Sequence, residues 1–258
     1  MKQYLKIDEW KIIEDQFHPA YNEITESIFS LGNGRMGQRG SFEETYTGKT
    51  LQGNYVAGVY YPDKTRVGWW KNGYPEYFAK VLNACNWVGI RLELNDEKLD
   101  LSTAQVRFFY RELDMFKGTL TRKFKCVLKS GQELEITSIR FCSMHNEEIA
   151  AIQYTITPLN FSGNVKFTIY LDNNVTNSDA NYDEFSWMED TERVGVRKGV
   201  VSARTKKTNF LVATAMRFSF WEDKEIVEIH PNIAQRSLYI DNHFEHFLEK
   251  GKTYTIKK

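Results

Sequence analysis

The sequence predicts an all-β protein folded as one large antiparallel β-sandwich with few short helices. Apolar and polar residues alternate with a period of two over most of the chain, as in strands that bury one face. The alternating runs are short, and polar turns separate them. No segment of about 12 residues carries the apolar stripe of an amphipathic helix. We therefore treat residues 1–258 as a single β domain.

The alternation gives the order of the predicted strands along the chain. They are residues 90–94, 99–101, 120–128, 134–141, 152–156, 165–171, 200–205, 209–221, 226–230, 238–240 and 253–256. Polar turn sequences separate several of them, at residues 95–98, 129–132 and 160–164. In the strand at 120–128, for example, Phe124, Cys126 and Leu128 lie on one face.

The strand that begins at Leu134 contains an irregularity. Its apolar positions change parity, from Leu134 and Ile136 to Ile139 and Phe141. One extra residue in a strand turns the following side chains to the opposite face. We therefore predict a β-bulge at Ser138.

Four segments are not typical of strands. Residues 76–84 and 244–250 are predicted to form short helices. Residues 31–61 are rich in glycine and residues 62–77 in aromatic side chains, and both segments are predicted to be irregular.

The composition excludes several classes of protein. The chain has 34 Lys and Arg against 34 Asp and Glu, and 14% of its residues are aromatic. The aromatic content excludes a disordered chain, and zero net charge gives no broad field for nucleic acid or an anionic membrane. The three cysteines lack the spacing of a disulfide framework or a zinc site. Residues 1–17 lack the apolar core of a signal peptide, so we expect a cytoplasmic protein with reduced thiols.

A glycine pattern and two arginines stand out in the first irregular segment. The candidate residues are Gly32, Asn33, Gly34, Arg35, Gly37, Arg39 and Gly40. A dinucleotide site needs the pattern G-x-G-x-x-G to open a helix inside a βαβ unit, and the sequence predicts neither. We therefore interpret the glycines as scaffold, a backbone path that needs positive φ or close approach. Arg35 and Arg39 have two interpretations, a salt bridge that fixes the loop or a fork of donors for a carboxylate or phosphate.

The second irregular segment carries the aromatic residues Trp69, Trp70, Tyr74, Tyr77 and Phe78. Loops are usually polar, so these rings need a burial partner. Three interpretations stay open: a protein interface, a lid over the domain's own core, and a sugar whose apolar C–H groups stack on the rings.

The remaining polar clusters give no catalytic constellation. His243 and His246 lie three residues apart without a third ligand, so we expect no metal site. The acidic residues between 183 and 192 can supply a carboxylate pair for glycoside chemistry, but a solvated loop also explains them. We expect no cofactor.

Three longer strings resemble the N-terminal signature of glycoside hydrolase family 65. They are ESIFSLGNGRMGQRGSFEE at residues 26–44, LQGNYVAGV at 51–59 and LDMFKGTLTR at 113–122. The resemblance covers nearly the whole chain. The family contains maltose, kojibiose and trehalose phosphorylases, and residues 61–84 look most like maltose phosphorylases.

The resemblance implies a super-sandwich similar in fold to galactose mutarotase. In the family an (α/α)6 barrel follows, and its glutamate protonates the leaving sugar oxygen while phosphate attacks the anomeric carbon with inversion. None of those catalytic residues can be placed on this chain. The resemblance therefore implies a non-catalytic N-terminal domain of an enzyme that cleaves an α-glucosidic disaccharide with inorganic phosphate as co-substrate. Maltose is the disaccharide that the resemblance favours.

The resemblance also implies partners. The chain ends within a predicted strand, so we expect it to be part of a longer enzyme, with the missing barrel, a second copy in a homodimer and a disaccharide as partners. A stand-alone carbohydrate-binding module that uses residues 69–77 is the alternative. An aldose epimerase, suggested by fold analogy alone, would need His145 or His230 beside a carboxylate.

Overall fold

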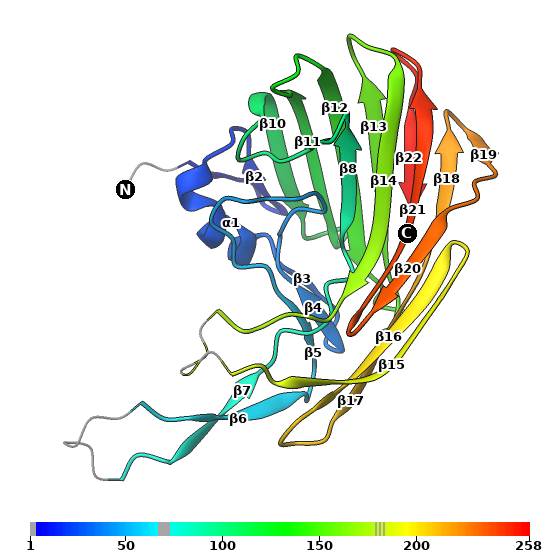
Figure 1. Cartoon of the computed structure of the whole chain (residues 1–258). Coiled ribbons are helices and arrows are strands. Elements are labelled where there is room, and N and C mark those ends of the chain that lie inside the picture. The colour runs from blue at the N-terminus through cyan, green and yellow to red at the C-terminus, as the bar shows by residue number, and fades with distance from the viewer. Residues whose placement is uncertain (1–3, 67–72, 179, 181, 183) are drawn as a thin grey trace.

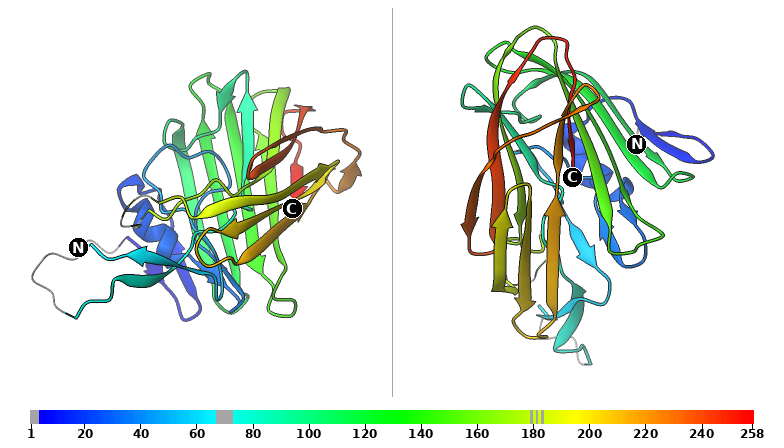
Figure 2. Two further views of the ribbon diagram at one scale, coloured as in Figure 1. Left: turned by 60° about the horizontal axis from the view of Figure 1, so that its bottom comes forward. Right: turned by 90° about the vertical axis from the view of Figure 1, so that its right-hand side faces the viewer.

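The computed structural model of the protein describes residues 4–66, 73–178, 180, 182 and 184–258. Two large sheets face each other as the layers of a β-sandwich (Figure 1; Figure 2, right). The described strand pairs of both sheets are antiparallel. The all-β antiparallel sandwich predicted from the sequence is therefore confirmed.

The two layers differ in size. The larger sheet has nine strands, in the spatial order β1 (Lys6–Ile7), β2 (Lys11–Glu14), β10 (Gln105–Asp114), β11 (Thr119–Val127), β12 (Glu133–Cys142), β13 (Ala150–Pro158), β22 (Tyr254–Lys257), β18 (Ser219–Glu222) and β19 (Glu225–Val227). The facing sheet has five strands, in the order β20 (Asn232–Arg236), β21 (Tyr239–Leu248), β14 (Gly163–Asp172), β8 (Ile90–Leu94) and β9 (Glu97–Lys98).

Smaller elements extend from the sandwich. One three-stranded sheet has the order β15 (Trp187–Gly195), β16 (Lys198–Thr205), β17 (Leu211–Arg217), and another has the order β3 (Leu31–Gly32), β4 (Met36–Gln38), β5 (Asn54–Val56). The strands β6 (Tyr60–Lys64) and β7 (Tyr77–Val81) form a hairpin, and the helices are η1 (Pro19–Tyr21) and α1 (Asn22–Ile28). The β6–β7 hairpin projects away from the sandwich (Figure 1). The segment at residues 31–61, predicted to be irregular, thus contains only short strands.

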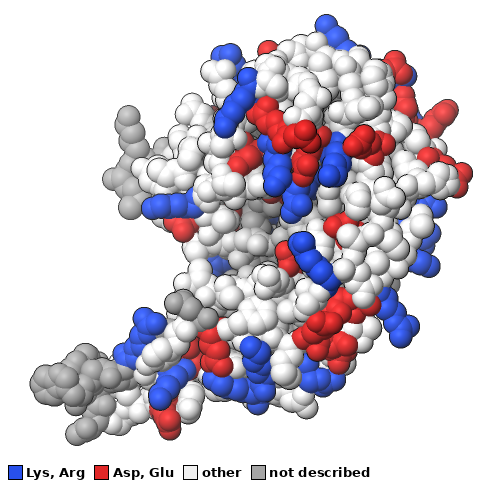
Figure 3. Space-filling view, in the orientation of Figure 1, with Lys and Arg blue, Asp and Glu red and all other residues white. Residues whose placement is uncertain are grey.

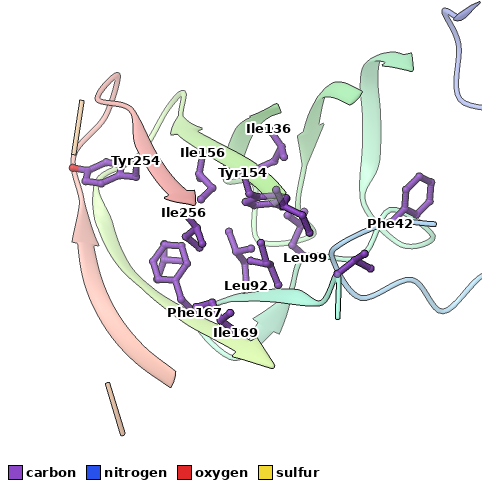
Figure 4. Close-up of a cluster of buried hydrophobic side chains, with 14 of the residues drawn as sticks. Phe42, Leu92, Leu99, Ile136, Tyr154, Ile156, Phe167, Ile169, Tyr254 and Ile256 are labelled. Carbon is purple, nitrogen blue, oxygen red and sulfur yellow. The ribbon is translucent and has the colours of Figure 1, made fainter. Parts of the chain in front are cut away.

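The main core fills the space between the two large sheets (Figure 4). Ile136 and Ile156 point into it from the nine-stranded sheet, and Leu92 and Phe167 meet them from the five-stranded sheet; all four are fully buried. Burying one such side chain contributes about 1.5–3 kcal/mol to folding. The period-two alternation is therefore the pattern that aligns one apolar face on each layer.

The β-bulge predicted at Ser138 is wrong. From Leu134 to Phe141, β12 pairs with β11 and β13 without a register shift. Ser138 and Arg140 therefore stay on the inner face and are buried, while Ile139 and Phe141 lie on the outer face and are partly exposed. The apolar pattern changes parity because the inner face becomes polar at this end of the sheet, and no residue is inserted.

Both predicted helices are wrong. Residues 76–84 contain β7, which pairs with β6, and residues 244–250 contain the end of β21, which pairs with β14 over 10 residues. Short segments have little helix stability of their own, so strand pairing decides their structure. The helix that does form, α1, has 7 residues, too few to show an apolar stripe in the sequence.

The long strand predicted at residues 209–221 is two strands in different sheets. β17 ends at Arg217 and β18 begins at Ser219. Buried Phe218 lies between them, where the chain crosses from the small sheet to the nine-stranded sheet. A continuous apolar alternation therefore does not require one continuous strand.

The described residues contain no disulfide bond and no helix that could span a membrane. Cys85, Cys126 and Cys142 are free and buried. None of the helices in the described part of the chain has the length and apolar character needed to cross a membrane.

Candidate functional site

The glycine pattern forms the tight hairpin between β3 and β4. Gly32 pairs with Gly37, and Gly34 at the tip has a φ of +88°, which favours glycine. Asn33 Oδ1 accepts hydrogen bonds from the backbone N–H of Arg35 at 3.1 Å and of Met36 at 2.9 Å. This turn stands where a dinucleotide site requires a helix start, and the scaffold role of the glycines stays a prediction.

Asn33 also ties the hairpin to a distant loop. Its Nδ2 donates to the carbonyl oxygens of Ser143 at 2.7 Å and Glu147 at 3.0 Å, in the loop between β12 and β13. One side chain therefore fixes the turn internally and anchors it across more than 100 residues of sequence.

The two arginines of the pattern have different surroundings. Arg39 donates from Nε to the Tyr55 hydroxyl at 3.2 Å and from Nη1 to Ser27 Oγ at 2.9 Å. Arg39 thus contacts the loop through hydroxyl groups, and no ion pair of this residue is found within the described residues. Arg35 is exposed and lines a groove described below.

Gly40 allows a close approach of two backbone segments. A Cβ at this position would lie 2.8 Å from Phe29 Cβ and 3.1 Å from the Phe29 carbonyl oxygen. Its N–H donates to the Glu26 carbonyl at 2.7 Å. The chain from residue 39 to residue 44 can therefore run directly against the end of α1.

Behind this segment lies a group of charged side chains that we call the buried ionic cluster. Its members are Glu14, Glu43, Glu44, Arg111, Arg122 and Arg140, all buried. Arg122 Nη2 lies 2.8 and 2.6 Å from the carboxylate oxygens of Glu44 and also donates to Glu43. Arg111 donates to Glu14 at 2.9 and 2.6 Å. Three carboxyl groups thus face three guanidinium groups, which is how buried charges are tolerated.

The buried ionic cluster holds the backbone of residues 39–44. Arg111 Nη1 donates to the carbonyl oxygen of Gly40 at 3.0 Å, and Arg140 Nη2 donates to that of Ser41 at 2.7 Å. The hydroxyls of Ser138 and Tyr154 also donate to the cluster, to Glu43 at 2.7 Å and to Glu44 at 2.5 Å. These contacts fix the segment that follows the glycine hairpin onto the inner face of the nine-stranded sheet.

The cluster moves the pKa values of its two adjacent carboxyl groups in opposite directions. Burial raises the pKa of Glu43, but Arg122 and Arg140 outweigh this effect and hold it at about 2. Burial raises the pKa of Glu44, and Arg122 offsets only part of that rise. Divergent carboxyl pKa values are a feature of acid–base pairs. Here both groups are buried against arginines, so we assign them a structural role.

The aromatic segment is only partly described. Trp69 and Trp70 lie outside the described residues. Tyr74, Tyr77 and Phe78 are 48, 45 and 44% exposed on or beside the projecting hairpin. These three rings do not cover the domain's own core, so the lid interpretation fails for them, and they are open to contact with another molecule.

The remaining acidic and histidine candidates have local partners. Glu184 accepts from the Tyr61 hydroxyl at 2.7 Å, and Asp190 accepts from Ser202 Oγ at 2.8 Å. His243 Nδ1 lies 2.7 Å from Asp241 Oδ1. His145 and His230 are exposed. Within the described ranges, no group of three His, Cys, Asp or Glu residues is arranged to hold a metal.

A groove of about 930 Å³ lies beside the glycine hairpin, and we call it the β5–β17 groove. Arg35 and Asn54 line it on the side of β4 and β5, Leu211 lines it from β17, and Ile149 lines it from the residues that lead into β13. In Figure 3 the molecular surface is hollowed between the sandwich and the part that carries the projecting hairpin. The same view shows Lys and Arg interspersed with Asp and Glu, which agrees with the balanced charge of the chain.

The chain is similar to a known family of protein domains over most of its length. Residues 12–258 match the description "Glycosyl hydrolase family 65, N-terminal domain". The chain belongs to this family. The family-65 N-terminal domain thus accounts for the sandwich, the glycine hairpin and the segment that the buried ionic cluster holds.

Three relatives define its neighbourhood in the family. Maltose phosphorylase from Bacillus subtilis (strain 168) is 38% identical over 95% of this chain, which spans 32% of that protein. Alpha,alpha-trehalose phosphorylase from Thermoanaerobacter brockii is 31% identical over 100% of this chain, which spans 34% of that protein. The solved structure of a putative kojibiose phosphorylase from human microbiome matches with a TM-score of 0.83 and 28% identity, over 99% of this chain and 33% of that one. The family-65 chain described here therefore spans about a third of the length of these relatives.

Two of the sequence strings that resemble family 65 meet in the buried ionic cluster. The string at residues 26–44 ends with Glu43 and Glu44, and the string at residues 113–122 ends with Arg122. These three side chains form the central ion pairs of the cluster. The sequence alone does not show that these residues make contact.

Proposed function

We propose that this chain is the non-catalytic N-terminal domain of a phosphorylase that cleaves an α-glucosidic disaccharide, with maltose as substrate. The observation that supports this most directly is the 38% identity to a maltose phosphorylase along 95% of the chain. The chain spans only 32% of that relative, so the proposal places the chemistry in polypeptide outside this chain.

In the proposed reaction, inorganic phosphate attacks the anomeric carbon with inversion. A glutamate in the rest of the enzyme protonates the oxygen of the leaving sugar. The buried carboxyl groups described above support this division of labour, because Glu43 and Glu44 are paired with Arg122 and are shielded from solvent.

The projecting hairpin is proposed to contact the catalytic part or a second subunit of a homodimer. Tyr77 and Phe78 expose nearly half of their surface, and aromatic side chains are enriched at protein interfaces. We also propose a cytoplasmic location, which the free, buried cysteines favour.

The test of the proposed function measures glucose 1-phosphate release from maltose, kojibiose and trehalose in the presence of inorganic phosphate. The longer polypeptide that carries this domain is expected to act on maltose, and the purified 258-residue chain is expected to release none. Release by the chain alone would refute its non-catalytic role. A longer polypeptide that prefers kojibiose or trehalose would refute maltose as the substrate.

The hairpin is tested in the longer polypeptide with Tyr77→Ser combined with Phe78→Ser. The expected result is a smaller assembly by light scattering or a lower kcat/KM for the disaccharide. The matched control is Phe247→Ser, because Phe247 is 55% exposed on β21 at another surface. If the double variant behaves like this control in both measurements, the hairpin has neither role.

A further inference from the structure

The β5–β17 groove contains a buried amide whose side chain has no partner. Asn54 is 3% exposed and lines the groove, and neither its Oδ1 nor its Nδ2 bonds to a described residue. Its backbone is fully used, because its N–H donates to Asn83 Oδ1 at 2.9 Å and its carbonyl accepts from Ala84 N–H at 2.7 Å. A buried amide without a partner among the described residues is a position where an added segment could pair.

The last strand of the chain points toward this groove. Lys258 exchanges two backbone hydrogen bonds with Ile152, at 2.8 and 2.9 Å, continuing the antiparallel pairing of β22 with β13. In the same register, the next positions of an extended chain would lie beside Ala151 and Ala150, and Ala150 lines the groove. Lys258 is held in place, because its Nζ donates to the carbonyl oxygens of Gly89 at 3.0 Å and Tyr170 at 2.8 Å.

The other side of this path is a free strand edge. β22 pairs on its second side with β18, and the single residue Phe218 separates the start of β18 from the end of β17. Among the described strands, β17 pairs only with β16, so its other edge has unpaired backbone groups. A chain that continues from β22 is therefore directed between the start of β13 and the free edge of β17.

We propose that the polypeptide following Lys258 in the longer enzyme docks in the β5–β17 groove as an extended segment. This docking proposal rests on the proposed function, according to which the chain is part of a longer polypeptide. The occupant is a main chain, which offers an N–H and a carbonyl to the Asn54 amide and can add to the edge of β17. The walls suit its apolar side chains, since Ile149 and Leu211 are each 51% exposed there.

Thiol labelling in the longer polypeptide tests this docking. Ala213→Cys places a thiol on an exposed residue of β17 that lines the groove, and Ala20→Cys is the matched control on exposed η1, away from it. The three cysteines of the chain described here are buried and give little background. We expect a maleimide to label Ala213→Cys at least about tenfold more slowly than Ala20→Cys, because docked segments open only transiently. Equal labelling rates would overturn the proposal.

Photo-crosslinking identifies the occupant. A benzophenone amino acid incorporated in place of Ala213 during synthesis should crosslink to a peptide that follows Lys258, as read by mass spectrometry. Protection that rises with protein concentration, with crosslinks between copies, would assign the groove to a second subunit and refute the proposal. Protection that needs added maltose would assign it to sugar and also refute it.

The outcome is separable from that of the proposed function. Glucose 1-phosphate release is measured on the same Ala213→Cys polypeptide before labelling. Activity together with fast labelling refutes only the docking, whereas protection without phosphorolysis refutes only the proposed function.

Discussion

Replacing Arg122 by methionine is expected to destabilise the domain strongly. Arg122 is the main partner of two buried carboxyl groups, Glu43 and Glu44. The variant leaves Glu43 with Arg140, 3.4 Å away, and leaves Glu44 with the Tyr154 hydroxyl as its remaining side-chain partner. Removing one member of a buried ion pair costs about 3–5 kcal/mol because the remaining charge stays buried.

The pKa of Glu43 gives the same order of magnitude for Arg122 and Arg140 acting together. Its two arginines move that pKa from 4.5 to about 2 against the effect of burial. At about 1.4 kcal/mol per pKa unit, this shift corresponds to about 3 kcal/mol of stability. Most small domains are stable by only about 5–15 kcal/mol, so the Arg122→Met change removes a large fraction.

The assay is equilibrium unfolding of the purified chain in urea, followed by circular dichroism. The matched control is Lys207→Met, which removes an exposed ion pair to Glu184 of 2.7 Å and is expected to cost about 0–1 kcal/mol. Arg122→Lys keeps the charge and gives a measurable intermediate if the methionine variant does not fold. A loss no larger than that of the Lys207→Met control would refute the role assigned to the buried ionic cluster.

The cost of Arg122→Met should also depend on pH. The folded-state pKa of Glu43 is lower than its ordinary value, so its contribution is complete above pH 4.5 and is lost as the pH falls toward 2. Protonation of Glu44, whose pKa burial already raises, relieves the variant further in acid. The difference in unfolding free energy between wild type and variant should therefore shrink from pH 7 to pH 3. A constant difference would contradict this reasoning.

Three further changes follow from the same geometry. Asn33→Ala removes the anchor of the glycine hairpin and should lower the unfolding free energy by about 1–3 kcal/mol; an unchanged urea midpoint would show that the anchor is dispensable. Gly40→Ala places a Cβ 2.8 Å from Phe29 and should lower the unfolding free energy by about 1–3 kcal/mol. Gly163→Ala is the control and should be nearly neutral, because no atom lies nearer than 3.8 Å to its Cβ. Similar losses in the two variants would contradict the close approach at Gly40. Tyr77→Ser should leave the stability of the isolated chain within about 0.5 kcal/mol, and a larger loss would mean that its ring packs on the domain.

The sequence predicts the layers of the fold well and the local elements less well. Where a strand buries apolar side chains on one face, as at residues 120–128 and 165–171, the alternation places it correctly. The predicted helix at residues 244–250 fails because ten residues of pairing with β14 outweigh local preference. β10 is missed because its inward positions are Phe109, Arg111 and Leu113, and the buried Arg111 interrupts the apolar pattern.

The buried ionic cluster is missed for a related reason. Its members come from β2, the segment at residues 39–44, and β10 to β12, and each looks like a solvated surface charge in its own segment. One signal is present in the sequence: in β12 the inner positions after Ile136 are Ser138 and Arg140. The change of apolar parity in β12 is explained either by a bulge or by an inner face that becomes polar. A polar inner face buries the charge of Arg140, which then requires a buried partner of opposite charge elsewhere in the chain.

The glycine hairpin and the buried ionic cluster together hold the parts of the β5–β17 groove that come from β5 and from the residues before β13. The cluster fixes residues 39–44, and the strand just before this segment, β4, pairs with β5, which carries Asn54. Asn33 joins the hairpin tip to the loop at residues 143–147, and that loop leads directly to Ile149 and Ala150 on the opposite wall. Contacts made by residues 26–44 therefore help to position one side of the groove. If this is correct, Asn33→Ala in the longer polypeptide should speed the labelling of Ala213→Cys, because the two walls lose their direct link. Slow labelling in that double variant would mean that the hairpin does not position the groove.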